Sequence, residues 1–98
     1  MRVKMIMKWD GFTPAQYEAI RHTVQWEGNV PDGAVFHVAA FDDNGIRVTD
    51  IWESAELCNA FVQNRLMPGI IKEGITTQPQ VELIPVHAIF VPALQRVT

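Results

Sequence analysis

Several features that define large classes of protein are missing from this sequence. It has one cysteine, Cys58, so no disulfide can form within the chain. Its eight lysines and arginines are scattered and its net charge is −3, which leaves no basic patch for a nucleic acid. No apolar run approaches the roughly 18 residues that span a bilayer. Residues 1–9 carry Lys4 and Lys8 in an alternating pattern that a secretion signal would not have. We therefore expect a cytoplasmic protein that binds neither nucleic acid nor membrane.

Spacings typical of metal sites are also missing. The histidines, His22, His37 and His87, form no HxH or HxxxH pair, and one cysteine cannot give a CxxC motif. Two histidines and an aspartate from separate strands are an alternative way to hold a metal, but no spacing supports it. We expect neither a metal nor a cofactor. Cys58 lies among apolar residues of a predicted helix, and we interpret it as a core residue rather than a nucleophile.

The apolar content of 48% is enough for one small folded domain over residues 1–98. Alternating or continuous apolar residues predict four strands, at residues 2–9, 34–42, 46–53 and 80–91. Asn44-Gly45, between the second and third strands, is a strong signal for a two-residue hairpin turn of type I′. Pro85 lies inside the fourth strand and predicts that it is an edge strand, with the proline nitrogen pointing away from the ladder.

Two helices are marked by their first residues. The stretch TPAQ (residues 13–16) combines an N-cap, a proline at the first helical position and the glutamine of a capping box, and its helix should run to about Trp26. Ser54 caps a second helix, which Pro68-Gly69 should break or kink. The order βαββαβ predicts an α+β, ferredoxin-like fold, a four-stranded antiparallel sheet with two helices on one face.

The second and fourth predicted strands are apolar on both sides. One apolar row on the hairpin comprises Phe36, Val38, Ala40 and Ile51, and another on the fourth strand comprises Ile84, Val86, Ala88 and Phe90. A sheet with one face open to water alternates more cleanly than this. We therefore predict a homodimer in which a second copy packs against the sheet.

A two-residue loop at residues 44–45 also fixes the pairing of the hairpin. In that register Ala39 faces Asp50 and His37 faces Trp52, all on one side of the sheet. His37 and Asp50 are then diagonal neighbours, roughly 7–8 Å apart at Cα, close enough for their side chains to interact. Such a pair can hold the imidazole in one tautomer for acid–base chemistry. It can equally be a satisfied structural contact, and a different register would change the geometry.

The stretch GIRVTDIWESAE (residues 45–56) resembles the dimeric α+β barrel superfamily, in particular its antibiotic biosynthesis monooxygenase-like branch. The resemblance rests on a strand that ends in Trp-Glu-Ser and leads into a helix opening with small and acidic residues. It implies a dimeric α+β barrel with a pocket between sheet and helices, whose wall includes Trp52. On this basis His37 and Asp50 enter the pocket, and its apolar lining is completed by Val3, Met5, Met7 and Tyr17.

The sequence departs from two kinds of relative. Quinone-forming monooxygenases of this superfamily place an asparagine before the strand-three tryptophan, where this chain offers Asp50. Haem-degrading relatives use an asparagine in strand one and a histidine in the second helix; here strand one offers Met5 and Met7, and residues 54–74 contain no histidine. That argues against haem degradation. Histidine-dependent relatives such as polyketide cyclases work without a cofactor, and His37 with Asp50 fits that chemistry at least as well as oxygenation.

Two functions are therefore compatible with the sequence. The first is a cofactor-independent enzyme, monooxygenase-like or acid–base (cyclase- or isomerase-like), acting on an aromatic or polyketide-like small molecule. In it His37 is the general base, Asp50 orients it, Trp52 stacks on the ring, and His87, a weaker candidate, polarises an oxygen. The second is a non-catalytic ligand-binding or structural dimer. A cavity of a few hundred Å³ with convergent polar groups favours the first, and a tightly packed, satisfied pair favours the second.

Overall fold

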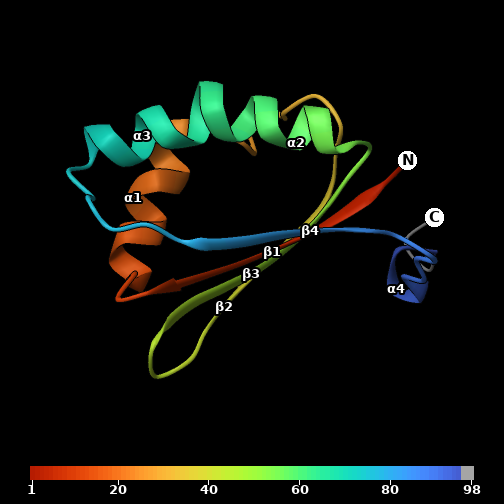
Figure 1. The fold of residues 1–98 in the computed structure, drawn as a ribbon, viewed down its shortest axis with the longest axis horizontal. Helices are drawn as coiled ribbons and strands as arrows, with labels where there is room; N and C mark the ends of the chain where they lie inside the picture. Colours follow the sequence, from red (N-terminus) through yellow and green to blue (C-terminus); the bar gives the residue numbers. More distant parts are fainter. Residues whose placement is uncertain (96–98) are drawn as a thin grey trace.

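The computed structural model describes residues 1–95, which form a four-stranded antiparallel sheet with helices over one face (Figure 1). The strands lie in the order β2-β3-β1-β4 and comprise β1 (Val3–Asp10), β2 (Ala34–Phe41), β3 (Gly45–Trp52) and β4 (Gln80–Pro85). The helical segments are α1 (Pro14–Val24), α2 (Ala55–Phe61), the π-helical turn η1 (Val62–Leu66), α3 (Met67–Lys72) and the short α4 (Pro92–Gln95). The predicted ferredoxin-like βαββαβ fold is confirmed.

The predicted helix starts are also confirmed. The Thr13 hydroxyl accepts the backbone N–H of Gln16 at 3.1 Å, and the Gln16 side chain accepts that of Thr13 at 2.9 Å. Helix α1 ends at Val24, earlier than predicted, because Gln25 adopts the left-handed conformation with φ of 59°. Pro68 does not break the second helical segment; the turn before it widens into a π-helix instead.

The register of the hairpin differs from the prediction by two residues. His37 lies directly opposite Asp50 rather than diagonal to it. The cause is Asp42, whose carboxylate accepts the backbone N–H groups of Asn44 at 2.8 Å and Gly45 at 3.1 Å and so closes a longer loop. Because the shift is an even number of residues, the side chains from Phe36 to Phe41 keep the faces predicted for them, whereas an irregularity between Ala34 and Phe36 interrupts the alternation at the start of the strand.

Gly45 belongs to β3 rather than to the turn. It pairs with Asp10 of β1, and a Cβ atom at this position would lie 2.2 Å from the carbonyl oxygen of Trp9. Its φ of 153° is also one that other residues rarely adopt. Strand pairing, not the hairpin turn, is therefore what requires this glycine.

Strand β4 is shorter than predicted. It is an edge strand that pairs only with β1, as Pro85 indicates, but it ends at Pro85 instead of continuing to residue 91. One more N–H, from Val86, reaches the Arg2 carbonyl at 2.9 Å, and beyond it β1 offers no residue to pair with. The predicted apolar row on this strand is therefore wrong beyond Ile84. His87 lies outside the sheet, on the segment that connects β4 to α4 (Figure 1).

The core lies between the sheet and the helices. Its buried members are Val3, Met5, Met7, Trp9, Phe12, Ile20, Val24, Ile46, Val48, Trp52, Cys58 and Ile70. Cys58 is only 1% exposed, and burial raises the pKa of its thiol to about 11. Its interpretation as a core residue is confirmed. Within residues 1–95, none of the helices has the length and apolar character needed to cross a membrane.

Candidate functional site

A cavity of about 420 Å³ lies between the sheet and the helices. This volume is within the roughly 300–1,000 Å³ typical of small-molecule sites. Its floor is the helix-facing side of β1, β2 and β3, and α1, the loop after α1 and the α2–α3 segment close it from the other side. The predicted site residues that line it are Met5, Met7, Tyr17, His37, Asp50 and Trp52.

Two predicted residues do not reach the cavity. His87 follows β4 and is exposed, because the strand ends before it, so within one chain it is not brought to His37 or Asp50. Val3 is buried in the core but does not line the cavity. The alternative of a metal held by two histidines and an aspartate has no geometric support, because across residues 1–95 no three His, Cys, Asp or Glu side chains gather in one place.

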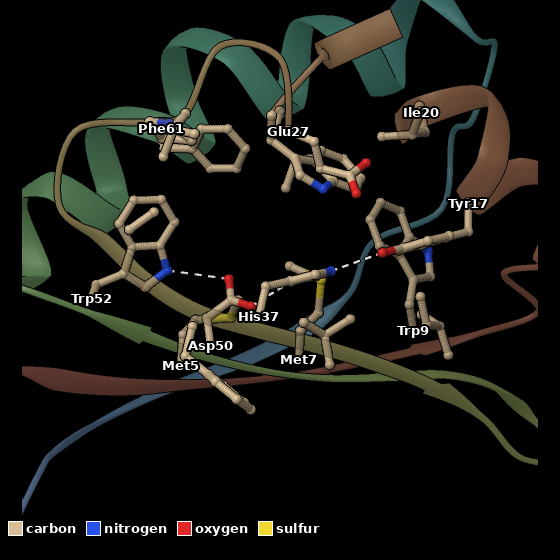
Figure 2. A pocket seen from close by; sticks show the side chains of 18 of the residues that line it. Met5, Met7, Trp9, Tyr17, Ile20, Glu27, His37, Asp50, Trp52 and Phe61 are labelled. Atoms are coloured by element: carbon tan, nitrogen blue, oxygen red, sulfur yellow. Dashed lines mark hydrogen bonds and ion pairs between the residues drawn. The ribbon is translucent and has the colours of Figure 1, made fainter. Parts of the chain in front are cut away.

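Four side chains on the cavity wall form a continuous hydrogen-bonded line (Figure 2). Trp52 donates its indole N–H to Asp50 Oδ2 at 3.1 Å, and His37 Nδ1 lies 2.6 Å from Asp50 Oδ1. The hydroxyl of Tyr17 lies 2.9 Å from His37 Nε2. Asp50 is 6% exposed, and each of its oxygens has a partner. Both nitrogens of the imidazole are likewise engaged.

The buried carboxylate determines the direction of these bonds. An ionised carboxylate can only accept, so Nδ1 of His37 donates to Asp50. In the neutral imidazole Nε2 then carries the lone pair, and Tyr17 donates its O–H to that atom. Donation therefore runs from Tyr17 through His37 to Asp50, and Trp52 donates to the same carboxylate from the other side. Tyr17, which the sequence predicts as part of the apolar lining, supplies the polar group at the end of this line, farthest from Asp50.

The surroundings of Tyr17 hold its hydroxyl in the protonated form. Burial raises the pKa of Tyr17 above its ordinary value of 10.0. Arg21 opposes this shift, whereas the carboxylates of Glu27, Glu18 and Asp50 add to it. At neutral pH the residue is thus a phenol that donates a hydrogen bond.

This shift can be measured directly because the chain has a single tyrosine. We expect tyrosinate absorbance of the native protein to appear with a midpoint above pH 10, and that of the unfolded chain with a midpoint near 10. Since the folded state holds the proton more tightly, the contribution of Tyr17 to stability is complete below the unfolded pKa and is lost as pH rises through the folded pKa. The Tyr17→Phe variant contains no tyrosine and therefore gives the background absorbance to be subtracted. A native midpoint at or below the unfolded one would contradict the expectation.

The loop after α1 contributes residues that were not predicted from the sequence. Trp26 and Glu27 line the cavity, and the Trp26 ring centroid lies 5.6 Å from that of His37. Val30, also on this loop, lines the cavity and is 64% exposed, so the cavity opens to solvent here. Phe61 on α2 closes the side above Trp52, with ring centroids 5.3 Å apart. No motif marks these residues, because the path of the chain brings them to the site.

Three solved structures are similar to this chain along almost its whole length. SnoaB, a cofactor-independent oxygenase from Streptomyces nogalater, is 15% identical over 90% of this chain and 95% of its own, with a TM-score of 0.66. NE2512, a protein of unknown function from Nitrosomonas europaea, is 14% identical over 93% and 94%, with a TM-score of 0.66. A monooxygenase from the gene ActVA-Orf6 of Streptomyces coelicolor, in complex with nanaomycin D, is 14% identical over 92% and 91%, with a TM-score of 0.54.

These similarities establish the fold. No protein-family model matches the chain, and no curated protein is significantly similar to it. At such low identity the shared architecture does not carry an activity across. The chain shares the ferredoxin-like α+β fold of these structures, so what the resemblance of Trp52-Glu53-Ser54 predicted is confirmed at the level of fold.

Proposed function

We propose that the protein is a cofactor-independent, monooxygenase-like enzyme that removes a proton from a ring compound bound in the cavity. The observation that carries this proposal is the hydrogen-bonded line from Tyr17 to Asp50 in the wall of a largely apolar cavity. His37 was the predicted base, but Tyr17 occupies its Nε2. Within this hydrogen-bonded line, the Tyr17 oxygen is therefore the atom that contacts a ligand.

In this mechanism the substrate gives a proton to the Tyr17 oxygen while Tyr17 passes its own proton to His37 Nε2. Asp50 stabilises the resulting imidazolium, and the Trp52 N–H keeps the carboxylate in position. Because burial raises the pKa of Tyr17, moving both protons together avoids a free phenolate. The substrate anion then reduces dioxygen. For a ring methylene the balance is R₂CH₂ + O₂ → R₂C=O + H₂O.

Anthrone, a three-ring ketone with an acidic methylene, tests the proton step separately from the oxygen step. In deuterium oxide under argon, the protein should exchange the methylene hydrogens faster than buffer does, because a positioned base typically contributes about 10²–10⁴-fold. In air it should convert anthrone to anthraquinone with release of water. Exchange at the buffer rate across the pH range in which the protein is folded would overturn the proposal.

A ligand-binding protein without catalysis is the second candidate, and one observation favours it. Among the described residues no buried side-chain nitrogen or oxygen lacks a hydrogen-bond partner, so the Asp50 cluster is satisfied without a substrate. In that case anthrone would bind and quench tryptophan fluorescence while its exchange rate stayed at the buffer value. The same experiment thus separates the two functions.

We also propose that the protein forms a homodimer through the face of the sheet opposite the helices, which Figure 1 shows uncovered. Strand pairing aligns Phe36, Ile51, Lys4 and Ile84 in one row across this face, and Val38 begins the next row. Phe36, Val38 and Ile84 are 41%, 46% and 40% exposed. Exposed apolar side chains on one face, here separated by Lys4, support a protein interface, and a two-fold related copy would present the same surface in return.

A further inference from the structure

The ionisable groups around the cavity are acidic or neutral. Within the described part of the chain, the lining includes Glu27 and Asp50 together with His37 and Tyr17, and it includes no lysine or arginine. Most of the remaining lining is apolar, with aromatic rings from all three tryptophans of the chain. A ligand that enters this cavity therefore meets two carboxylates and no lining cation of fixed charge.

Arg21 keeps Glu27 ionised without itself reaching the cavity. The Nε and Nη2 atoms of Arg21 donate to the two oxygens of Glu27 at 2.5 Å and 2.7 Å. This bidentate contact lowers the pKa of the Glu27 carboxyl below its ordinary value. Since Glu27 lines the cavity and Arg21 does not, the ligand side of this ion pair is its carboxylate. Glu27 lies on the same loop as Val30, where the cavity opens.

We propose that Glu27 makes the site selective by charge, so that it accepts uncharged ring compounds and rejects the corresponding carboxylic acids. The inference rests on the proposed function only in assigning the ring compound to this cavity. A carboxylate that enters loses its water in apolar surroundings and faces Glu27 and Asp50 without a cationic partner. An uncharged hydroxyl carries neither penalty and can hydrogen-bond to Tyr17.

Aloe-emodin and rhein are suitable probes because they share one planar three-ring skeleton and differ only in a hydroxymethyl group and a carboxylate. Their dissociation constants can be measured by quenching of Trp9, Trp26 and Trp52, which all line the cavity. At neutral pH and low salt we expect rhein to bind about tenfold or more weakly than aloe-emodin. Added salt should narrow the gap, because the coulombic part of the discrimination is screened at the open mouth.

Glu27→Gln separates this repulsion from the general cost of burying a carboxylate. Its side chain is 59% exposed, so we expect a modest gain in rhein affinity, about two- to fivefold, with aloe-emodin affinity unchanged. Glu18→Gln is the matched control. Glu18 also contacts Arg21, at 3.4 Å, but it does not line the cavity, so neither affinity should change.

Three outcomes would overturn the inference. Equal binding of the two probes to the wild type, or an equal gain in rhein affinity from Glu27→Gln and Glu18→Gln, would refute selection by Glu27 and leave the proposed function standing. Failure of both probes to bind would refute the assignment of ring compounds to this cavity, and with it both the proposed function and the inference.

Discussion

Asp50→Asn should slow the exchange of anthrone hydrogens by about 10²–10⁴-fold while the fold stays intact. Asparagine has nearly the same shape as aspartate, and its amide oxygen can still accept the Trp52 N–H. Its NH₂ group must then face His37 Nδ1, where the wild type has an accepting oxygen. Two donors cannot share that contact, so His37 changes tautomer and Nε2 takes the hydrogen. Tyr17 then has no acceptor for its proton. Proton transfer from Tyr17 to His37 therefore stops, even though the four side chains remain in place.

Nitrogen NMR of the imidazole ring measures the tautomer independently of any substrate. We expect Nδ1 of His37 to carry the hydrogen in the wild type and Nε2 to carry it in Asp50→Asn. Asp43→Asn is the control, because Asp43 is an exposed acid in the hairpin loop and does not line the cavity. It should keep both the wild-type tautomer and the wild-type exchange rate. An Asp50→Asn variant with a normal rate would show that the line does not transfer protons.

The hairpin illustrates which parts of the site the sequence could predict. Alternation along β2 and β3 correctly predicts that His37, Asp50 and Trp52 lie on one face of the sheet. The predicted loop length was wrong, but the resulting shift at His37 is two residues, and only an odd shift would change the face. The predicted length of the loop was wrong because two local sequence signals favour different loops. Asn44-Gly45 favours a two-residue turn, whereas the Asp42 side chain closes a longer one. In the structure the Asp42 contact prevails.

The remaining parts of the site depend on packing between distant segments. Glu27 lies on the loop that follows the early end of α1, where α1 approaches α3 closely; a Cβ atom on Gly69 would lie 2.7 Å from Val24 Cγ2. The end of β4, and with it the position of His87, depends on where β1 begins rather than on the apolar pattern of β4 itself. Tyr17 lies on the cavity side of α1, as predicted, but its polar role required the position of His37.

Val38→Asp should convert the proposed dimer into a monomer. Val38 is 46% exposed near the middle of β2, on the uncovered face of the sheet. In a two-fold symmetric dimer each substitution enters the interface twice, and each new carboxylate would be buried without a cationic partner. Burial of an unpaired charge costs several kcal/mol, and about 1.4 kcal/mol weakens a dissociation constant tenfold. In the free chain the same side chain lies in water, so the fold should tolerate it.

Size-exclusion chromatography with light scattering at micromolar concentration measures this directly. The wild type should have twice the chain mass of 11.1 kDa, and Val38→Asp should have the mass of one chain with an unchanged circular dichroism spectrum. Val81→Asp is the matched control. Val81 is 52% exposed on edge strand β4, but it pairs with Met7 and so belongs to the helix-facing side of the sheet. The introduced charge is the same and the exposure is similar, so this variant should remain a dimer if the outer face alone is the interface. A monomeric wild type, or dissociation by Val81→Asp and not by Val38→Asp, would contradict the proposed interface.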